Sequence, residues 1–128
     1  MVLKRTLLIA EDEPVMRMAI QDALEPLENF DVIEAVDGCE ALQLIDDCKP
    51  DLVILDLLMP KMGGIDVLEI LQGRGEAEPT YKIVVLSALV EPCLVERLHA
   101  LGAYRVMTKP FHVDELLRMV EEVSHGTG

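Results

Sequence analysis

The sequence predicts an α/β fold: a single (βα)5 doubly wound parallel sheet with the flavodoxin-like strand order 2-1-3-4-5. Three observations predict it. The chain has 128 residues, the length of one domain. Short aliphatic runs that contain no polar residue are typical of strands buried on both faces of a parallel sheet. Helical patterns separate these runs, and such an alternation places right-handed crossovers on both faces of one open sheet.

The expected strands are short and aliphatic. Three of them are strong continuous runs, at 7–10, 52–55 and 83–86. A fourth run, at 106–107, is weaker. The fifth run, 32–36, is interrupted by Glu34, as suits a strand at the edge of the sheet.

A helical pattern follows each expected strand. Pro14 fits the first turn of the first helix, and Pro26 limits its end. Pro92 opens the fourth helix, which Gly102 ends. The other three helices carry their apolar faces at Ala41, Leu42, Ile45 and Cys48, at Val67, Leu68 and Leu71, and at Val113, Leu116, Leu117 and Val120. We expect residues 1–124 to form the domain and 125–128 to be a tail or the start of a linker.

Composition excludes several classes of protein. Hydrophobic residues make up 51% of the chain and aromatic residues 3%, so the core is aliphatic and the chain is not disordered. The longest apolar stretch, 52–59, is interrupted by Asp56, so no membrane span is expected. The apolar run after Lys4 and Arg5 covers only 7–10, which is too short for a secretory signal, and we predict a cytoplasmic protein. The net charge of −13 argues against direct nucleic-acid binding by this domain. The three cysteines lack metal-ligand spacing and are expected to be buried or idle thiols.

Charged and polar residues follow the expected strands at one edge of the sheet, where ligands bind in such folds. Glu11 and Asp12 follow the first strand, and Asp56 follows the third. Because these two strands are neighbours in the predicted order, we expect the three carboxylates to meet in one cleft. Ser87 follows the fourth strand and Lys109 the fifth, on the other side of this cleft.

This set of residues predicts a phosphoryl-acceptor site. Three neighbouring carboxylates repel one another and raise one another's pKa. A hard divalent cation removes that penalty, and oxygen ligands suit Mg²⁺. The metal and Lys109 would neutralise the phosphoryl oxygens, the Ser87 hydroxyl would donate to one of them, and the Asp56 carboxylate would attack phosphorus.

The segments LLIAEDEP, PDLVILDLLMPKMGG, VVLSA and TKPF resemble the receiver domain of two-component response regulators. The resemblance covers residues 4–123, and its motifs fall in the family's order and at its spacing. Among receivers, the chain looks most similar to the receiver domain of the sporulation master regulator of Gram-positive bacteria.

The resemblance implies a role for each residue of the acidic cleft. Asp56 would be the phosphorylated residue. Asp12 would ligate Mg²⁺ directly and Glu11 through water, with the backbone carbonyl of Leu58 as a further ligand. Leu58 and Leu89 would flank the path of the water that hydrolyses the phosphoryl group, and neither side chain can orient or deprotonate water.

The resemblance also implies how the other side of the cleft works. Ser87 would contact the phosphoryl group and move on activation, and Lys109 would pair with Asp56 or its phosphate, with a cis peptide at Lys109–Pro110. The chain departs from the family at Val106, where receivers often carry tyrosine or phenylalanine. An aromatic flip at this position is therefore not available.

The implied function is a signalling switch and not an enzyme. A histidine kinase or phosphotransfer protein would phosphorylate Asp56. The surface of the fourth helix, fifth strand and fifth helix would then change to regulate an output, expected to be transcription, with a phosphorylation-dependent homodimer as one form of that output. A stand-alone receiver acting through protein partners is the first alternative.

Two further alternatives are weaker. A phosphohydrolase with an aspartyl-phosphate intermediate typically carries a second aspartate two residues after the nucleophile, where this chain has Leu58. A receiver-like binding module without phosphorylation would be expected to lack Asp56, Asp12 or Lys109, and all three are present.

Overall fold

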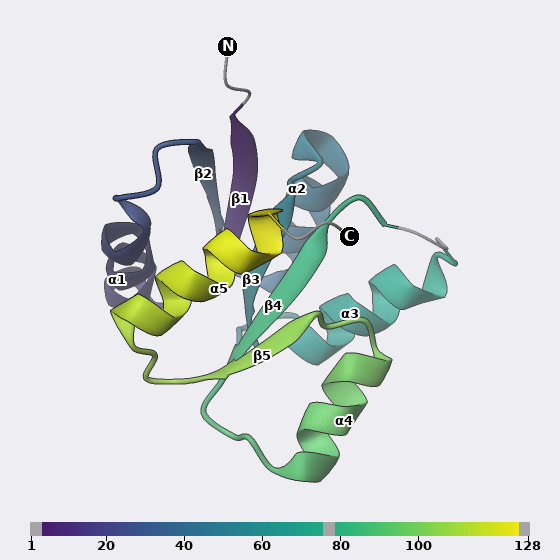
Figure 1. The fold of residues 1–128 in the computed structure, drawn as a ribbon. Coiled ribbons are helices and arrows are strands. Elements are labelled where there is room, and N and C mark those ends of the chain that lie inside the picture. Colours follow the sequence, from purple (N-terminus) through teal and green to yellow (C-terminus); the bar gives the residue numbers. More distant parts are fainter. Residues whose placement is uncertain (1–3, 76–78, 126–128) are drawn as a thin grey trace.

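The structure, a computed structural model, describes residues 4–75 and 79–125 (Figure 1). Strands and helices alternate along them. The strands are β1 (Arg5–Ala10), β2 (Phe30–Ala35), β3 (Leu52–Asp56), β4 (Lys82–Ser87) and β5 (Arg105–Thr108). The helices are α1 (Pro14–Leu24), α2 (Gly38–Cys48), α3 (Gly64–Gly73), α4 (Pro92–Ala100) and α5 (Val113–His125). The strands are parallel in the order β2-β1-β3-β4-β5, which confirms the predicted fold.

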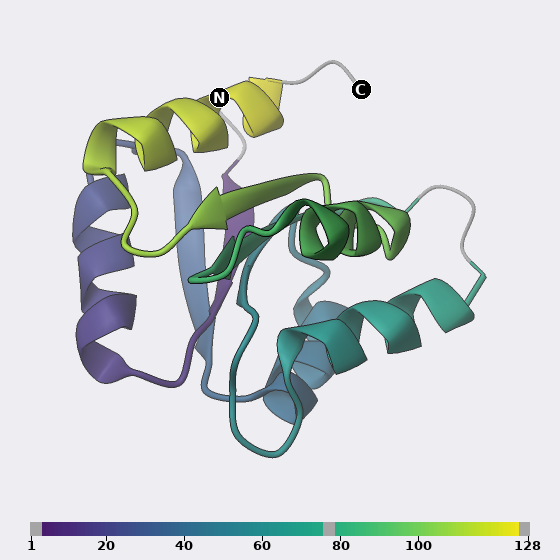
Figure 2. The same ribbon diagram turned by 90° about the horizontal axis from the view of Figure 1, so that it is seen from below.

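Helices cover both faces of the sheet (Figure 2). Each face has its own hydrophobic core. Successive side chains of a strand point to opposite faces. Leu7 and Ile9 of β1 therefore pack with residues of α1 and α5, whereas Leu8 and Ala10 pack with residues of α2, α3 and α4. This two-sided burial is the reason why the strands appear in the sequence as continuous aliphatic runs.

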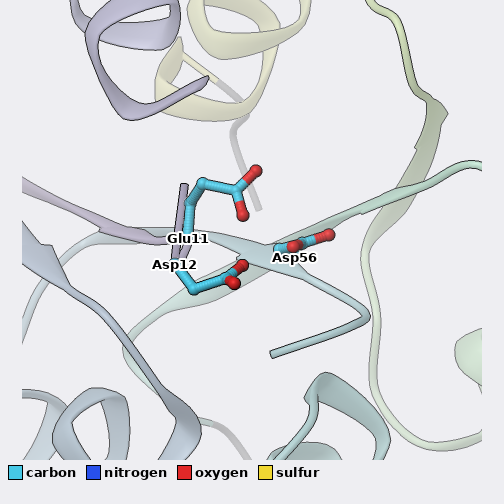
Figure 3. A group of neighbouring side chains, drawn as sticks. All are labelled: Glu11, Asp12 and Asp56. Carbon is cyan, nitrogen blue, oxygen red and sulfur yellow. The ribbon is translucent and has the colours of Figure 1, made fainter. Parts of the chain in front are cut away.

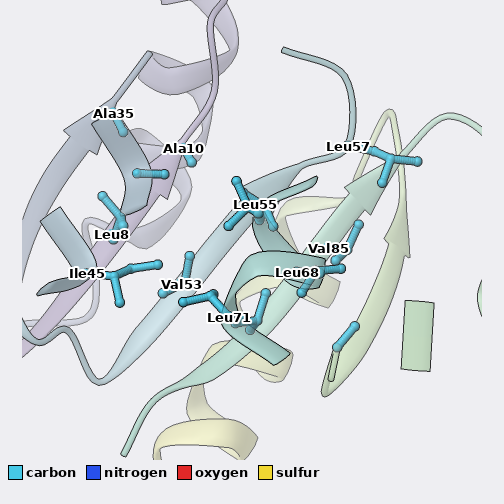
Figure 4. Packing of buried hydrophobic residues seen from close by; sticks show 14 of the residues in the cluster. Leu8, Ala10, Ala35, Ile45, Val53, Leu55, Leu57, Leu68, Leu71 and Val85 are labelled. Carbon is cyan, nitrogen blue, oxygen red and sulfur yellow. The ribbon is translucent and has the colours of Figure 1, made fainter. Parts of the chain in front are cut away.

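Strand β3 lies between β1 and β4, and all five of its residues are buried. Its Val53 and Leu55 side chains face the core that also contains Ile45 of α2 and Leu71 of α3 (Figure 4). The only polar residue of this strand is its last, Asp56, which lies at the carboxyl end of the strand. The fold thus carries one carboxylate to a fixed, buried position.

Several details differ from the sequence prediction. The edge strand β2 spans residues 30–35 instead of 32–36, and α5 continues to His125, which was assigned to the tail. Cys48 and Val113 are exposed because each lies at an end residue of its helix, beyond the part that packs on the sheet. All three cysteines are free and exposed, so they are not buried thiols, and the alternative of idle thiols stays a prediction. Residues 126–128 of the predicted tail lie outside the described residues.

No helix in the described parts of the chain is long and apolar enough to cross a membrane.

The loop from β3 to α3 is held by close backbone contacts at two glycines. The Gly64 N–H donates a hydrogen bond of 2.8 Å to the Leu57 carbonyl, and a Cβ added at Gly64 would lie 2.7 Å from the Asp56 carbonyl oxygen. The Gly38 N–H, at the start of α2, donates to the Met62 carbonyl at 3.0 Å. Both helices therefore press directly against the chain that leaves Asp56.

Gly64→Ala should destabilise the protein, because its methyl group must displace the backbone at the end of β3. We expect a loss of about 1–3 kcal/mol in the free energy of unfolding, as for other overpacked sites. Gly73→Ala is the matched control in the same helix, since a Cβ there meets nothing within 4 Å. Alanine at Gly73 should be neutral or stabilise the helix by up to about 0.5–1 kcal/mol. Urea unfolding of both variants measures the difference, and equal effects would contradict the argument.

Candidate functional site

Three carboxylates meet at the carboxyl edge of the sheet, as the sequence predicted. Glu11 and Asp12 directly follow β1, and Asp56 ends β3, the neighbouring strand. One oxygen from each side chain lies within 4.8 Å of the others (Figure 3). Glu11 is 1% exposed and Asp56 4% exposed, whereas Asp12 is half-buried at the open side of the group. We call these three residues the acidic cleft.

Lys109 is the cation of this cleft. Its Nζ atom donates hydrogen bonds to Glu11 Oε1 at 2.9 Å and to Asp56 Oδ1 at 3.0 Å. Burial opposes its charge, but the hydrogen bonds and charges of Glu11 and Asp56 outweigh burial and raise the pKa of Lys109 above 10.5. The Lys109 N–H also donates to the Ser87 carbonyl at 2.9 Å, and the Lys109–Pro110 peptide is cis, as predicted.

Glu11 holds a proton more tightly than an ordinary glutamate. Burial is the largest cause of the shift. The neighbouring Asp56 carboxylate adds to it, and Lys109 opposes it. Together they raise the pKa of Glu11 from 4.5 to about 7. One lysine therefore does not fully compensate the buried carboxylates at neutral pH.

The donor set suits a divalent cation. Within the described residues, Glu11 Oε2 is buried and has no hydrogen-bond partner. An orphaned carboxylate oxygen beside two further carboxylates offers the hard oxygen ligands that Mg²⁺ prefers. The carbonyl predicted as a further ligand belongs to Leu58, two residues beyond Asp56. Leu58 is 74% exposed. These groups could hold Mg²⁺ at the end of β3.

Ser87 lies beside the cleft, but its hydroxyl is turned into its own loop. The residue before it, Leu86, is the register partner of Asp56. The Ser87 hydroxyl donates to the Leu89 carbonyl at 2.7 Å and accepts from the Leu89 N–H at 3.0 Å. To reach a group on Asp56, this hydroxyl must give up its bond to the Leu89 carbonyl.

Arg17 also contacts the cleft, although its place in the sequence does not predict this contact. Its Nη1 atom donates a hydrogen bond of 2.8 Å to the backbone carbonyl of Glu11. A single arginine in an amphipathic helix forms no motif with Glu11, so no sequence pattern indicates this contact. Only the path of the chain after β1 brings the two residues together.

Comparison with known proteins gives one consistent family. A family model described as "Response regulator receiver domain" matches residues 7–121. The transcriptional regulatory protein PdtaR of Mycobacterium tuberculosis is 40% identical over 118 residues, which are 91% of this chain and 55% of that protein. The chemotaxis protein CheY of Listeria monocytogenes is 32% identical over 118 residues, which are 92% of this chain and 97% of that protein.

Solved structures agree with the sequence relatives. The receiver domain of the Francisella response regulator 1452 superposes with a TM-score of 0.87 at 30% identity, covering 98% of this chain and 100% of that one. The chain spans about half the length of PdtaR, 55%, so the similarity to that protein concerns one part of it.

The raised pKa of Glu11 predicts a pH dependence of stability in metal-free protein. A folded-state pKa above the unfolded value means that the stability present below pH 4.5 is lost as pH rises through about 7. The free energy of unfolding should fall by about a few kcal/mol over this pH range. Urea unfolding in EDTA at several pH values measures it for the wild type and for Glu11→Gln. The variant should lack this decline, and equal slopes in both proteins would contradict the assignment.

Proposed function

The chain belongs to the response regulator receiver family, and on that premise we propose that it is a phosphorylation-dependent switch whose phosphoryl group is accepted by Asp56. The observation that carries the proposal is the acidic cleft: a buried Asp56 carboxylate within 4.8 Å of Glu11 and Asp12, and hydrogen-bonded to Lys109 at 3.0 Å. A nucleophilic carboxylate beside a cation site and a lysine is suited to phosphoryl transfer.

We propose that each group acts on a different part of the transfer. An oxygen of Asp56 forms the new bond to phosphorus while the bond from phosphorus to the donor breaks, and the donor atom keeps that electron pair. Lys109, already at hydrogen-bond distance from Asp56, neutralises charge on the phosphoryl oxygens. Asp12, Asp56 and the Leu58 carbonyl would hold Mg²⁺ together with Glu11, which would act through water, and the bound ion would supply the remaining positive charge.

The Ser87 hydroxyl would report the modification to the rest of the domain. Its exchange of the Leu89 carbonyl for a phosphoryl oxygen would release the loop that leads into α4. We propose that the surface of α4, β5 and α5 then changes and regulates the output. Val106, half-buried on β5, takes no part through an aromatic flip.

The phosphoryl donor is proposed to be a histidine kinase or a phosphotransfer protein. Transcription is the proposed output, supported by 40% identity to a transcriptional regulatory protein, and a phosphorylation-dependent homodimer is one form it could take. The closer resemblance to the sporulation master regulator, the cytoplasmic location and the lack of direct nucleic-acid binding remain predictions.

A stand-alone receiver that acts through protein partners is the second candidate. The observation in its favour is the similarity to the chemotaxis protein of Listeria monocytogenes, of which the chain covers 97%. A phosphohydrolase is disfavoured, because the position two residues after Asp56 carries the apolar side chain of Leu58, which cannot act as an acid or base.

Phosphorylation should require both Asp56 and Mg²⁺. We expect acetyl phosphate to add one phosphoryl group to the wild type in the presence of Mg²⁺, and to add none in EDTA or to Asp56→Asn. Asp47→Asn is the matched control, because Asp47 is an exposed aspartate of α2, outside the acidic cleft. Intact mass measures the product, and label retained on Asp56→Asn would refute the site.

The phosphoryl group should be lost slowly, because Leu58 and Leu89 cover the approach of water with apolar side chains. The two residues are 74% and 57% exposed, so the fold should tolerate polar substitutions there. Leu58→Asn and Leu89→Glu should each speed dephosphorylation several-fold by offering water a partner.

The rate is followed by mass after removal of acetyl phosphate at fixed Mg²⁺. Val113→Asn, an exposed apolar side chain at the start of α5, serves as the control. If neither substitution, nor the pair together, speeds the loss, Leu58 and Leu89 do not protect the phosphoryl group.

A further inference from the structure

We infer that Arg17 is a positioning residue of the acidic cleft: its guanidinium group holds the Glu11 carbonyl and thereby sets the peptide that joins Glu11 to Asp12. This inference deepens the proposed function, because it rests on the cleft binding Mg²⁺. Arg17 touches neither phosphoryl group nor metal in this role. It acts through the backbone of the two residues that follow β1.

Arg17 contacts the backbone of Glu11, whereas Lys109 contacts its side chain. Its Nη1 atom donates to the Glu11 carbonyl at 2.8 Å, and its Nε atom contacts Glu34 Oε1 of β2 at 3.1 Å. The Arg17 side chain is only 17% exposed, which is low for an arginine. The planar guanidinium group can donate to the Glu11 carbonyl and to the Glu34 carboxylate at the same time. A lysine ammonium group on a flexible stem does this less well.

The Glu11 carbonyl is the point at which the chain leaves the sheet. The Glu11 N–H still donates to the Ala35 carbonyl at 3.0 Å, as the last bond between β1 and β2. The peptide group beyond it is planar, so the direction of the Glu11 carbonyl also fixes the N–H and Cα of Asp12. The hydrogen bond from Arg17 therefore orients the backbone on which the Asp12 carboxylate stands.

Arg17 also restrains the other end of this short loop. Glu13 is the N-cap residue of α1, and its side chain makes no capping hydrogen bond with the described residues. The Arg17 N–H donates to the Glu13 carbonyl at 3.0 Å. Arg17 thus holds the loop from both ends, through its main chain at Glu13 and through its side chain at Glu11.

These contacts connect the edge of the sheet to the phosphoryl acceptor. Glu34 contacts Arg17, Arg17 holds Glu11, and Lys109 joins Glu11 to Asp56. Glu11 is therefore fixed at two atoms by two different cations, at its carbonyl by Arg17 and at its carboxylate by Lys109. Groups that support metal ligands in this way typically contribute 10–100-fold to metal affinity.

Mg²⁺ binding tests this role directly. The chain has no tryptophan, so binding is followed by backbone NMR shifts during Mg²⁺ titration of the 128-residue chain. Two variants remove the Arg17 charge: Arg17→Gln, and Arg17→Met, which keeps more of the apolar stem. The control Arg105→Gln also removes one positive charge, from an ion pair with Glu122 at the opposite end of the strands.

We expect the Kd for Mg²⁺ to rise about tenfold in whichever neutral Arg17 variant folds. It should stay the same or fall slightly in Arg105→Gln, because that variant only makes the chain more acidic. Arg17→Lys should recover part of the affinity. Thermal unfolding is measured in parallel, since a merely structural role would lower the Tm of the Arg17 variants and leave the Kd of the folded protein unchanged.

The inference is overturned if the neutral Arg17 variants bind Mg²⁺ as tightly as Arg105→Gln. If neither neutral variant folds, Arg17→Lys provides the test. In the absence of metal, its Asp12 amide resonance should differ in position from that of the wild type. An unchanged resonance overturns the inference. Failure of the wild type to bind Mg²⁺ would instead overturn the metal site in the proposed function, so the two failures are distinct.

Discussion

The burial of carboxylates at the ends of two neighbouring strands is the constraint on which the site depends. Glu11 and Asp56 are almost inaccessible to water and share a single ammonium group, that of Lys109. Taking ionised groups out of water is costly unless other charges compensate. Here the compensation is incomplete, since Glu11 Oε2 is left without a partner among the described residues. The fold thus holds a site with an electrostatic penalty that a bound cation or a proton would relieve.

The rigidity of the surrounding scaffold is what makes this penalty sustainable. Strand β3 is buried along its whole length, and the chain after Asp56 is pinned by Gly64 and Gly38 against the first turns of α3 and α2. Asp56 therefore cannot retreat towards solvent without disturbing two helices and two hydrophobic cores. Interiors are too densely packed to deform gradually. The electrostatic penalty remains localised at the cleft, where ligands can act on it.

The sequence carried enough information to predict the sheet and its order, because burial on both faces leaves continuous aliphatic runs such as 52–55 and 83–86. It also located Glu11, Asp12, Asp56 and Lys109, because parallel strands bring their carboxyl ends to one edge. Cys48 was misplaced because helical periodicity does not reveal where a helix stops packing on the sheet. The orientation of Ser87 and the contact of Arg17 could not be predicted either, since both depend on the exact course of loops after β4 and β1.

The two sides of the cleft are held in different ways, and this asymmetry bears on how a switch could work. On one side, Glu11 is fixed by Arg17 and Lys109, both part of a chain of contacts that reaches from β2 to Asp56. On the other side, the Ser87 hydroxyl bonds only to Leu89 among the described residues, within a loop whose side chains are exposed. Exchanging one hydroxyl acceptor for another changes few contacts, whereas moving Glu11 would disrupt several. A new charge on Asp56 would therefore displace the Ser87 loop before it displaced the acidic residues, and motion would be directed towards α4.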